Sequence, residues 1–187
     1  MRTYKTIILL LLISTNYCFS QKKIDDKRKF KSVIEISIDS TSSKINPLIK
    51  KANILLQEKK ESDELVKMYN ESKLSLKIHK ELVGKLIEVD SKINLKEQTL
   101  AYLDNCEKLL DSFILPTIKY INESETFERE KIVQAFTLMQ EAINQASTLS
   151  DSMEKFCIKY KLTRRLNDFD KEDYRKAIEE IKAKIEN

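Results

Sequence analysis

The chain has 187 residues, enough for one domain with a sizeable core, and it contains only one glycine and two prolines. Average usage of these two residue types together would be roughly 12%. Because the turns of β-sandwiches and the loops of α/β folds are rich in both, this composition argues against either architecture and favours long helices. The formal net charge is only +4, so we expect no concentrated basic surface and no nucleic-acid partner.

Residues 1–20 have the pattern of a cleavable signal peptide. A short basic start precedes the apolar run of residues 7–13, and Cys18 and Ser20 occupy the two positions that a signal peptidase reads. The run is too short to span a bilayer, which takes roughly 20 apolar residues. The pattern therefore predicts export to the periplasm or the medium, with cleavage before Gln21. An uncleaved anchor and a lipoprotein are the alternatives.

Residues 21–44 carry two competing patterns. The first part is polar and basic, which is typical of a flexible arm. Further on, Ile34, Ile36 and Ile38 alternate with polar residues, which indicates a strand, whereas Phe30, Ile34 and Ile38 share one face of a helix. A single strand would have no partner elsewhere in this chain. A short strand and a short helix therefore both stay open for this segment.

Residues 45–187 are predicted to form the helical domain. Asn46 is a good N-cap and Pro47 suits the first helical position, so a helix is expected to begin there. Apolar residues at heptad spacing continue towards residue 90 and favour one long helix. The alternative is two helices, the second of which is capped near Ser62.

Three further helices are expected after a break near Asp90. The first is ended or kinked by Pro116, the second runs over residues 127–160 after a turn at 122–126, and the third lies beyond residue 167. Without a sheet, these helices must bury their apolar stripes against one another. The sequence thus predicts an all-α protein, an elongated antiparallel bundle of four or five helices. A short N-terminal extended segment, whose structure is left open, precedes the bundle.

Cys106 and Cys157 are the two cysteines that remain once the signal peptide is removed. Two cysteines in an exported protein indicate a disulfide. Straight antiparallel helices would separate them by about 22 Å along the helix axis, much more than a disulfide spans. A bridge therefore requires the helix predicted over residues 127–160 to double back. Without such a turn, the two cysteines are either buried thiols or pair with another chain.

No set of residues in the sequence predicts a reaction or a cofactor. His79 is the only histidine, and it falls on an apolar helix face where a structural role is expected. The carboxylates occur in runs with basic residues, which is typical of solvated helix faces. We therefore expect a non-enzymatic protein that needs no metal or cofactor.

The most apolar stretch after the signal peptide is residues 109–116. In it, Leu110, Phe113, Ile114 and Leu115 either belong to the core of the bundle or form an exposed apolar docking knuckle. Two functions are compatible with the sequence. The first is binding to another protein, as an adaptor, inhibitor, immunity factor or chaperone. The second is action on a membrane surface or a lipid through the knuckle. Homo-oligomers are compatible with both.

Overall fold

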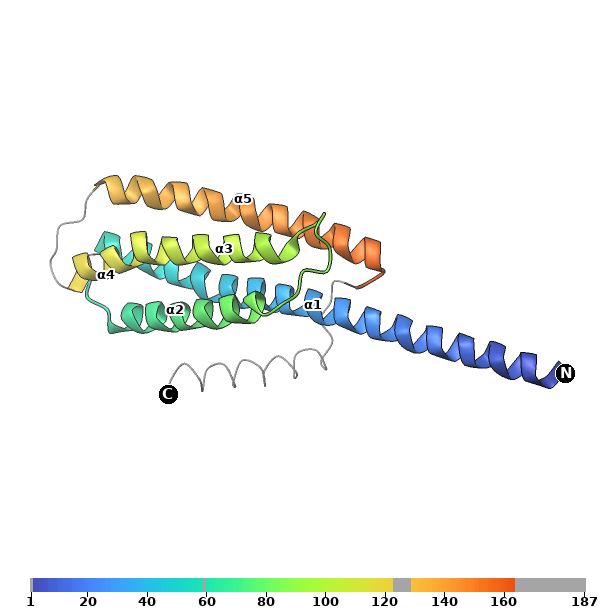
Figure 1. The fold of residues 1–187 in the computed structure, drawn as a ribbon. Coiled ribbons are helices and arrows are strands. Elements are labelled where there is room, and N and C mark those ends of the chain that lie inside the picture. Colours follow the sequence, from blue (N-terminus) through green and yellow to red (C-terminus); the bar gives the residue numbers. More distant parts are fainter. Residues whose placement is uncertain (1, 59, 123–128, 164–187) are drawn as a thin grey trace.

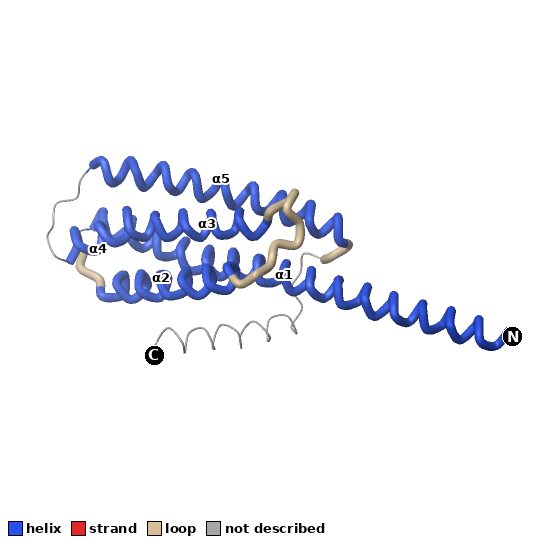
Figure 2. The backbone as a smooth tube through the Cα atoms, in the orientation of Figure 1, coloured by secondary structure: helices blue, strands red, loops and turns tan. Residues whose placement is uncertain are grey.

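The computed structural model describes residues 2–58, 60–122 and 129–163, with side chains from residue 26 onward apart from residues 129, 131 and 132. These ranges contain helices, turns and no strand, so the predicted all-α class is confirmed (Figure 2). The elements in chain order are α1 (Arg2–Glu58), α2 (Asp63–Gly84), α3 (Leu95–Leu109), the π-helix η1 (Leu110–Ile114), α4 (Leu115–Asn122) and α5 (Arg129–Tyr160).

Four of these helices lie side by side in an elongated bundle (Figure 1). α2 runs antiparallel to α1, α5 runs antiparallel to α3, and the short α4 prolongs α3 at one end. α3 packs against α1, α2 and α5, whereas α1 and α5 barely touch each other. The first part of α1 projects beyond the bundle towards the N-terminus. The bundle is therefore closed on three of its seams and open on the fourth, between α1 and α5.

Residues 21–44 belong to α1, so the flexible arm and the extended segment expected there are not found. Ile36 and Ile38, which completed the alternating pattern, are only partly buried. Phe30, Val33, Ile34, Ser37 and Thr41 are buried at a spacing of three or four residues, and Lys31 and Ser32 beside them are buried as well. This is the spacing of a helix with one face on a core. Because no second strand is available for pairing, the helical pattern decides the structure and the strand alternative is wrong.

Pro47 lies inside α1, so the helix start predicted at Asn46 is wrong. A proline in a helix interior removes the hydrogen bond to the carbonyl four residues earlier, here that of Ser43. Ser43 and Pro47 are both on the exposed side of α1, where water can bind that carbonyl. Ile45 and Leu48 on the other side are buried. Packing of that face keeps α1 continuous across the proline.

The favoured single helix over residues 47–90 is also wrong, and the alternative with a break near Ser62 is confirmed. Ser62 has an extended backbone, with φ −157° and ψ 104°, and its Oγ accepts a hydrogen bond from the Leu65 N–H at 3.2 Å. The Ser62 N–H donates in turn to Asn122 Oδ1 at 3.2 Å. This N-cap begins α2 and ties its first turn to the end of α4.

Pro116 does not end the helix that was predicted to begin after Asp90, because the chain continues through it as α4. The five-residue π-helix η1 precedes it, and the Leu115 N–H bonds to the Leu110 carbonyl five residues earlier. In a regular α-helix the Pro116 ring would collide with the carbonyl of Ser112. A π-turn widens the backbone at such a point, so the chain continues as α4 without a loop.

The core is formed by large apolar side chains from all the long helices. The largest fully buried side chains are Ile34, Leu48, Leu65, Leu76, Leu95, Leu103, Leu109, Leu110, Ile114, Leu149, Met153 and Phe156. Several buried hydroxyl groups accompany them, among them those of Thr99 and Thr117. Thr99 Oγ1 donates to the Leu95 carbonyl and Thr117 Oγ1 donates to the Phe113 carbonyl, both at 2.7 Å. Each of these two hydroxyls is thus paired within its own helix, which avoids the cost of about 1–3 kcal/mol of an unpaired buried group. The buried hydroxyls of Ser32, Ser37 and Thr41 have no hydrogen-bond partner among the described residues.

Two predicted elements lie outside the described residues. They are the turn at residues 122–126, of which only Asn122 is described, as part of α4, and the last helix beyond residue 167. The helix predicted over residues 127–160 corresponds to α5.

We predict that Pro47→Ala stabilises the protein by about 2 kcal/mol. The substitution restores the hydrogen bond to the Ser43 carbonyl and removes the ring clash, which together cost about 3 kcal/mol, less about 1 kcal/mol for the freer unfolded chain. Urea unfolding followed by circular dichroism measures the difference. Lys50→Ala, an exposed change one turn along α1, is the control and should stay within about 0.5 kcal/mol of wild type. An unchanged or lower stability of Pro47→Ala would show that the proline costs α1 nothing.

Candidate functional site

The apolar residues expected to form a docking knuckle are part of the core. Leu110 and Ile114 are fully buried, Phe113 is 3% exposed, and Leu115 is half-buried. η1 packs against the neighbouring helices and directs Leu110, Phe113 and Ile114 towards them. The docking alternative is therefore wrong for Leu110, Phe113 and Ile114, because these side chains are not available to a partner.

Cys106 and Cys157 are both buried thiols and are not joined by a disulfide. Cys106 faces Ala142 of α5 across a groove, and Cys157 follows Ala142 by 15 residues on the same unbroken helix. That spacing places the thiols about 22 Å apart along the axis. A bridge would require α5 to double back, and this does not occur, because α5 is continuous from Arg129 to Tyr160.

His79 is a buried side chain of α2 and is 2% exposed. No described residue forms a hydrogen bond with its Nδ1. Burial, and to a smaller extent the Lys44 ammonium group, lower the pKa of His79 to about 4. The ring is therefore neutral at physiological pH. No other ionisable side chain is described within hydrogen-bonding distance of Nδ1, so nothing in this part of the structure equips His79 as a general base.

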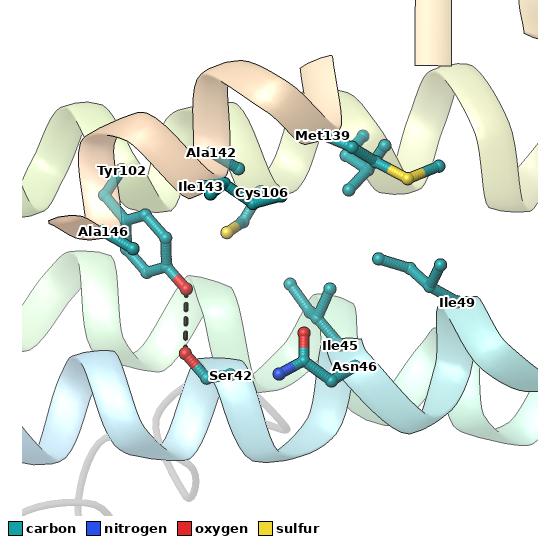
Figure 3. A pocket seen from close by; sticks show the side chains of 11 residues that line it. Ser42, Ile45, Asn46, Ile49, Tyr102, Cys106, Met139, Ala142, Ile143 and Ala146 are labelled. Carbon is teal, nitrogen blue, oxygen red and sulfur yellow. Dashed lines mark hydrogen bonds between the residues drawn. The ribbon is translucent and has the colours of Figure 1, made fainter. Parts of the chain in front are cut away.

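A groove opens between α1 and α5, with α3 as its floor (Figure 3). Its volume is about 400 Å³, which lies in the usual range of binding sites. The lining side chains are Ser42, Ile45, Asn46 and Ile49 from α1, Tyr102, Cys106 and Leu109 from α3, and Met139, Ala142, Ile143 and Ala146 from α5. None of these residues is charged, although charged residues make up 34% of the chain. The groove is therefore an apolar and electrically neutral surface.

One polar pair lies in the groove. Ser42 Oγ and the Tyr102 hydroxyl are 2.9 Å apart and share a hydrogen bond (Figure 3). Burial raises the pKa of Tyr102 to about 12, and the neighbouring Cys106 acts in the same direction. Burial also raises the pKa of the Cys106 thiol to about 11, against the opposite effect of its hydrogen bond with Tyr102. Both groups are therefore protonated at neutral pH, and Cys106 lacks the thiolate that nucleophilic chemistry needs.

The groove continues onto an exposed part of α5. We call this part the α5 stripe; its members recur every three or four residues and are Val133, Phe136, Gln140, Ile143 and Ser147. Val133, Phe136 and Ile143 are 61%, 65% and 63% exposed. Ile143 belongs both to the groove and to the stripe. Large exposed apolar side chains that share one helix face beside an apolar groove are typical of interaction surfaces.

The apolar spacing of the helix predicted over residues 127–160 indicates the face of α5 that carries Met139, Ala142 and Ala146, which are partly buried, but it did not reveal the stripe beside that face. The missed signal was the scarcity of charge. Between residues 133 and 150 the chain has a single charged residue, Glu141. A solvated helix face in this protein would carry several charges, so the gap indicated a face with another role.

A second polar site closes the bundle at the opposite end of α5. The Asp90 carboxylate, 6% exposed, pairs with the Lys159 ammonium group and accepts a hydrogen bond from the Tyr160 hydroxyl at 3.0 Å. The hydrogen bond from Lys159, followed by that from Tyr160, lowers the pKa of Asp90. Lys27 of α1 lies 4.0 Å from the centre of the Tyr160 ring. Each polar group in this cluster is matched by another part of the chain, so the cluster is structural.

The α2–α3 seam carries a network of ion pairs. Lys73 Nζ lies 2.9 Å from Glu107 and from Asp111, while Lys80 Nζ lies 2.5 Å from Asp104 and 2.8 Å from Glu107. Hydrogen bonds from Lys80 and Lys73 lower the pKa of Glu107. The network is partly exposed to water, so its contribution to stability is modest. Its carboxylates are paired with lysines, as expected of a solvated helix face.

No family of known proteins matches this chain, and no match is found among curated proteins or among solved structures. In the described ranges no helix has an apolar stretch of the length that a bilayer crossing requires. The same ranges contain no group of three or more His, Cys, Asp or Glu side chains placed to bind a metal ion. The groove and the α5 stripe are therefore the features from which a function can be argued.

The two thiols should be almost inert in the folded protein. We predict that Cys106 and Cys157 react with a disulfide reagent at pH 8 more than about 100-fold more slowly than in denaturant, because both are buried and reaction requires an opening of the fold. Absorbance of the released thiolate measures the rate. The variant Cys106→Ser, which keeps Cys157, separates the two contributions. Fewer than two reactive thiols in denaturant without reductant would show that a disulfide had formed.

Burial of neutral His79 should make the protein less stable in mild acid. The unfolded chain takes up a proton at His79 below about pH 6.5, whereas the folded chain does so only near pH 4. The unfolded state thus binds more protons between these values, and the free energy of unfolding falls as the pH is lowered, by up to about 3 kcal/mol.

Urea unfolding at pH 7 and pH 4.5 measures this effect. His79→Leu should lose less stability than wild type over the interval, because it has no imidazole to protonate. Equal losses in the two proteins would contradict the burial of a neutral ring.

Proposed function

We propose that this protein is an exported, non-enzymatic helical bundle that acts by binding another polypeptide in the groove between α1 and α5. The observation that carries the proposal is the neutral, apolar groove at the open seam of the bundle, continued by the α5 stripe. An amphipathic helix laid along this seam would bury the stripe and occupy the place of a further bundle helix. The adaptor, inhibitor, immunity and chaperone roles all use such a surface.

The chemistry of the groove supports binding over catalysis. Its polar groups are the paired hydroxyls of Ser42 and Tyr102, the Asn46 amide and the protonated thiol of Cys106. None of these can take up or release a proton readily at neutral pH. What the groove offers to a ligand is apolar area and a few neutral hydrogen-bonding groups.

Export supports the proposal from the sequence. The signal-peptide pattern of residues 1–20 lies in the part of α1 that projects beyond the bundle. Among the side chains that the structure describes, the first buried one is Phe30. Cleavage before Gln21 would therefore leave the described core residues in place. The second function considered from the sequence, action on membranes through residues 109–116, has no comparable support, because that segment lies in the core.

The proposal can be tested by photo-crosslinking in the host cell. A photoreactive amino acid placed at Ile143, in the groove, should give discrete crosslinked products with a polypeptide. The same amino acid at Ile87, which is 87% exposed in the loop between α2 and α3, is the matched control and should give none. The double variant Phe136→Asp/Ile143→Asp should lose binding to the crosslinked polypeptide by more than about 10-fold, because charges would enter an apolar interface. Identical products from positions 143 and 87, or no product from 143, would contradict the proposal.

A further inference from the structure

The exposed face of α5 that borders the groove is almost free of charge. Eleven residues between 133 and 150 are exposed, and Glu141 is the one charged member of this set; the others are Val133, Gln134, Phe136, Thr137, Gln140, Ile143, Asn144, Ser147, Thr148 and Ser150. The face is 18 residues long, or about 27 Å. The adjoining groove adds ten further lining residues without a charge, beside Ile143, which belongs to both.

This charge distribution restricts the partner. Interface cores are depleted in charged residues, and the two sides of an interface match in potential. A partner recognised through opposite charge would require charged residues here, and the face does not provide them. A matching surface must be equally neutral and equally apolar. Within the described residues from 26 onward, this stretch of α5 is the one exposed helix face of its length that is almost free of charge. A second copy of the same face is therefore a suitable electrostatic match for it.

The order of side chains along the α5 stripe is also self-complementary. If two copies of α5 pack antiparallel about a two-fold axis at Gln140, Phe136 of one copy lies beside Ile143 or Asn144 of the other. In the same arrangement bulky Val133 lies opposite small Ser147. The two Gln140 amides meet at the axis, where each can donate to and accept from the other. The large side chains of Phe136 and Ile143 from the two copies therefore lie side by side, and Val133 lies opposite the small Ser147.

We infer that the polypeptide bound in the groove is α5 of a second copy of this chain, which forms a two-fold symmetric antiparallel dimer. This inference rests on the proposed function and names its partner. Each α5 stripe covers the groove of the other copy, so that Phe136 and Ile143 are buried on both sides of the axis. The seam between α1 and α5 is closed in the dimer by the α5 helix of the partner.

Sedimentation velocity of the protein purified from its host tests the inference. Between about 1 and about 100 μM the chain should sediment as a dimer at the upper end of the range. Phe136→Asp/Ile143→Asp should sediment as a monomer throughout, with the helical circular dichroism spectrum of wild type, because both residues are exposed. Ile87→Asp, a matched change of an exposed isoleucine outside the stripe, should remain dimeric. A wild-type monomer at about 100 μM, or a dimer that both variants preserve, would overturn the inference.

A disulfide trap tests the position of the axis. Gln140→Cys should form a crosslinked dimer on mild oxidation, because the two positions face each other across the axis within the distance that a disulfide spans. Lys108→Cys, exposed on α3 away from the stripe, should not. Absence of crosslinking at position 140 in a dimeric protein would rule out this pairing of the helices. If the chain is monomeric and position 143 crosslinks to a different polypeptide, the second copy is excluded while the proposed function stands.

Discussion

Helix α3 and its continuation bury most of their circumference and leave only a narrow strip to solvent, and the arrangement of the other helices follows from this constraint. Leu103 and Asn105 are both buried although they lie on nearly opposite sides of α3, and the exposed strip between them carries Ala101, Asp104 and Lys108. α1, α2 and α5 must therefore all pack on α3 to cover it. α1, α2 and α5 all surround α3, so each of them cannot also contact both of the others along its whole length. α1 pairs with α2, and α5 packs mainly on α3. α5 also meets α1 where the Phe30 and Phe156 rings pack together, but the seam between α1 and α5 stays open at the groove.

Much of this fold could be predicted from the sequence, because the scarcity of glycine and proline and the spacing of apolar residues are local properties. Leu76, Leu103 and Phe156 are on predicted apolar faces and are buried. The errors occurred where local signals compete with tertiary ones. Ile34 fits a strand or a helix, and the choice depends on whether a neighbouring strand exists. Pro47 is a good first residue of a helix, but packing on its far side continues α1 through it.

The candidate site was harder to predict than the fold. A groove depends on the distance between two helices that are far apart in the sequence, and periodicity says nothing about that distance. The apolar stretch that attracted attention, around Phe113, is apolar because it lies at the centre of the bundle. The functional surface instead combines moderately apolar residues such as Val133 and Ile143 with an absence of charge. In a chain with so many lysines and glutamates, missing charges on an exposed face carry more information than a run of hydrophobic residues.

The buried threonines have a consequence for how the bundle selects one alignment of its helices over others. Since Thr99 and Thr117 bond to carbonyls of their own helix, their hydroxyl groups would be equally satisfied if that helix slid past its neighbours by one turn. The hydrogen bond from Asn105 to the Leu138 carbonyl is long, at 3.4 Å, and discriminates weakly. Misaligned packings are therefore excluded by the shapes of apolar side chains, by the hydrogen bond between Ser42 of α1 and Tyr102 of α3, and by the ion pairs of Lys73 and Lys80 at the surface. Burial of apolar side chains therefore stabilises the bundle, while the hydrogen bonds and ion pairs between helices favour one alignment of the helices over others.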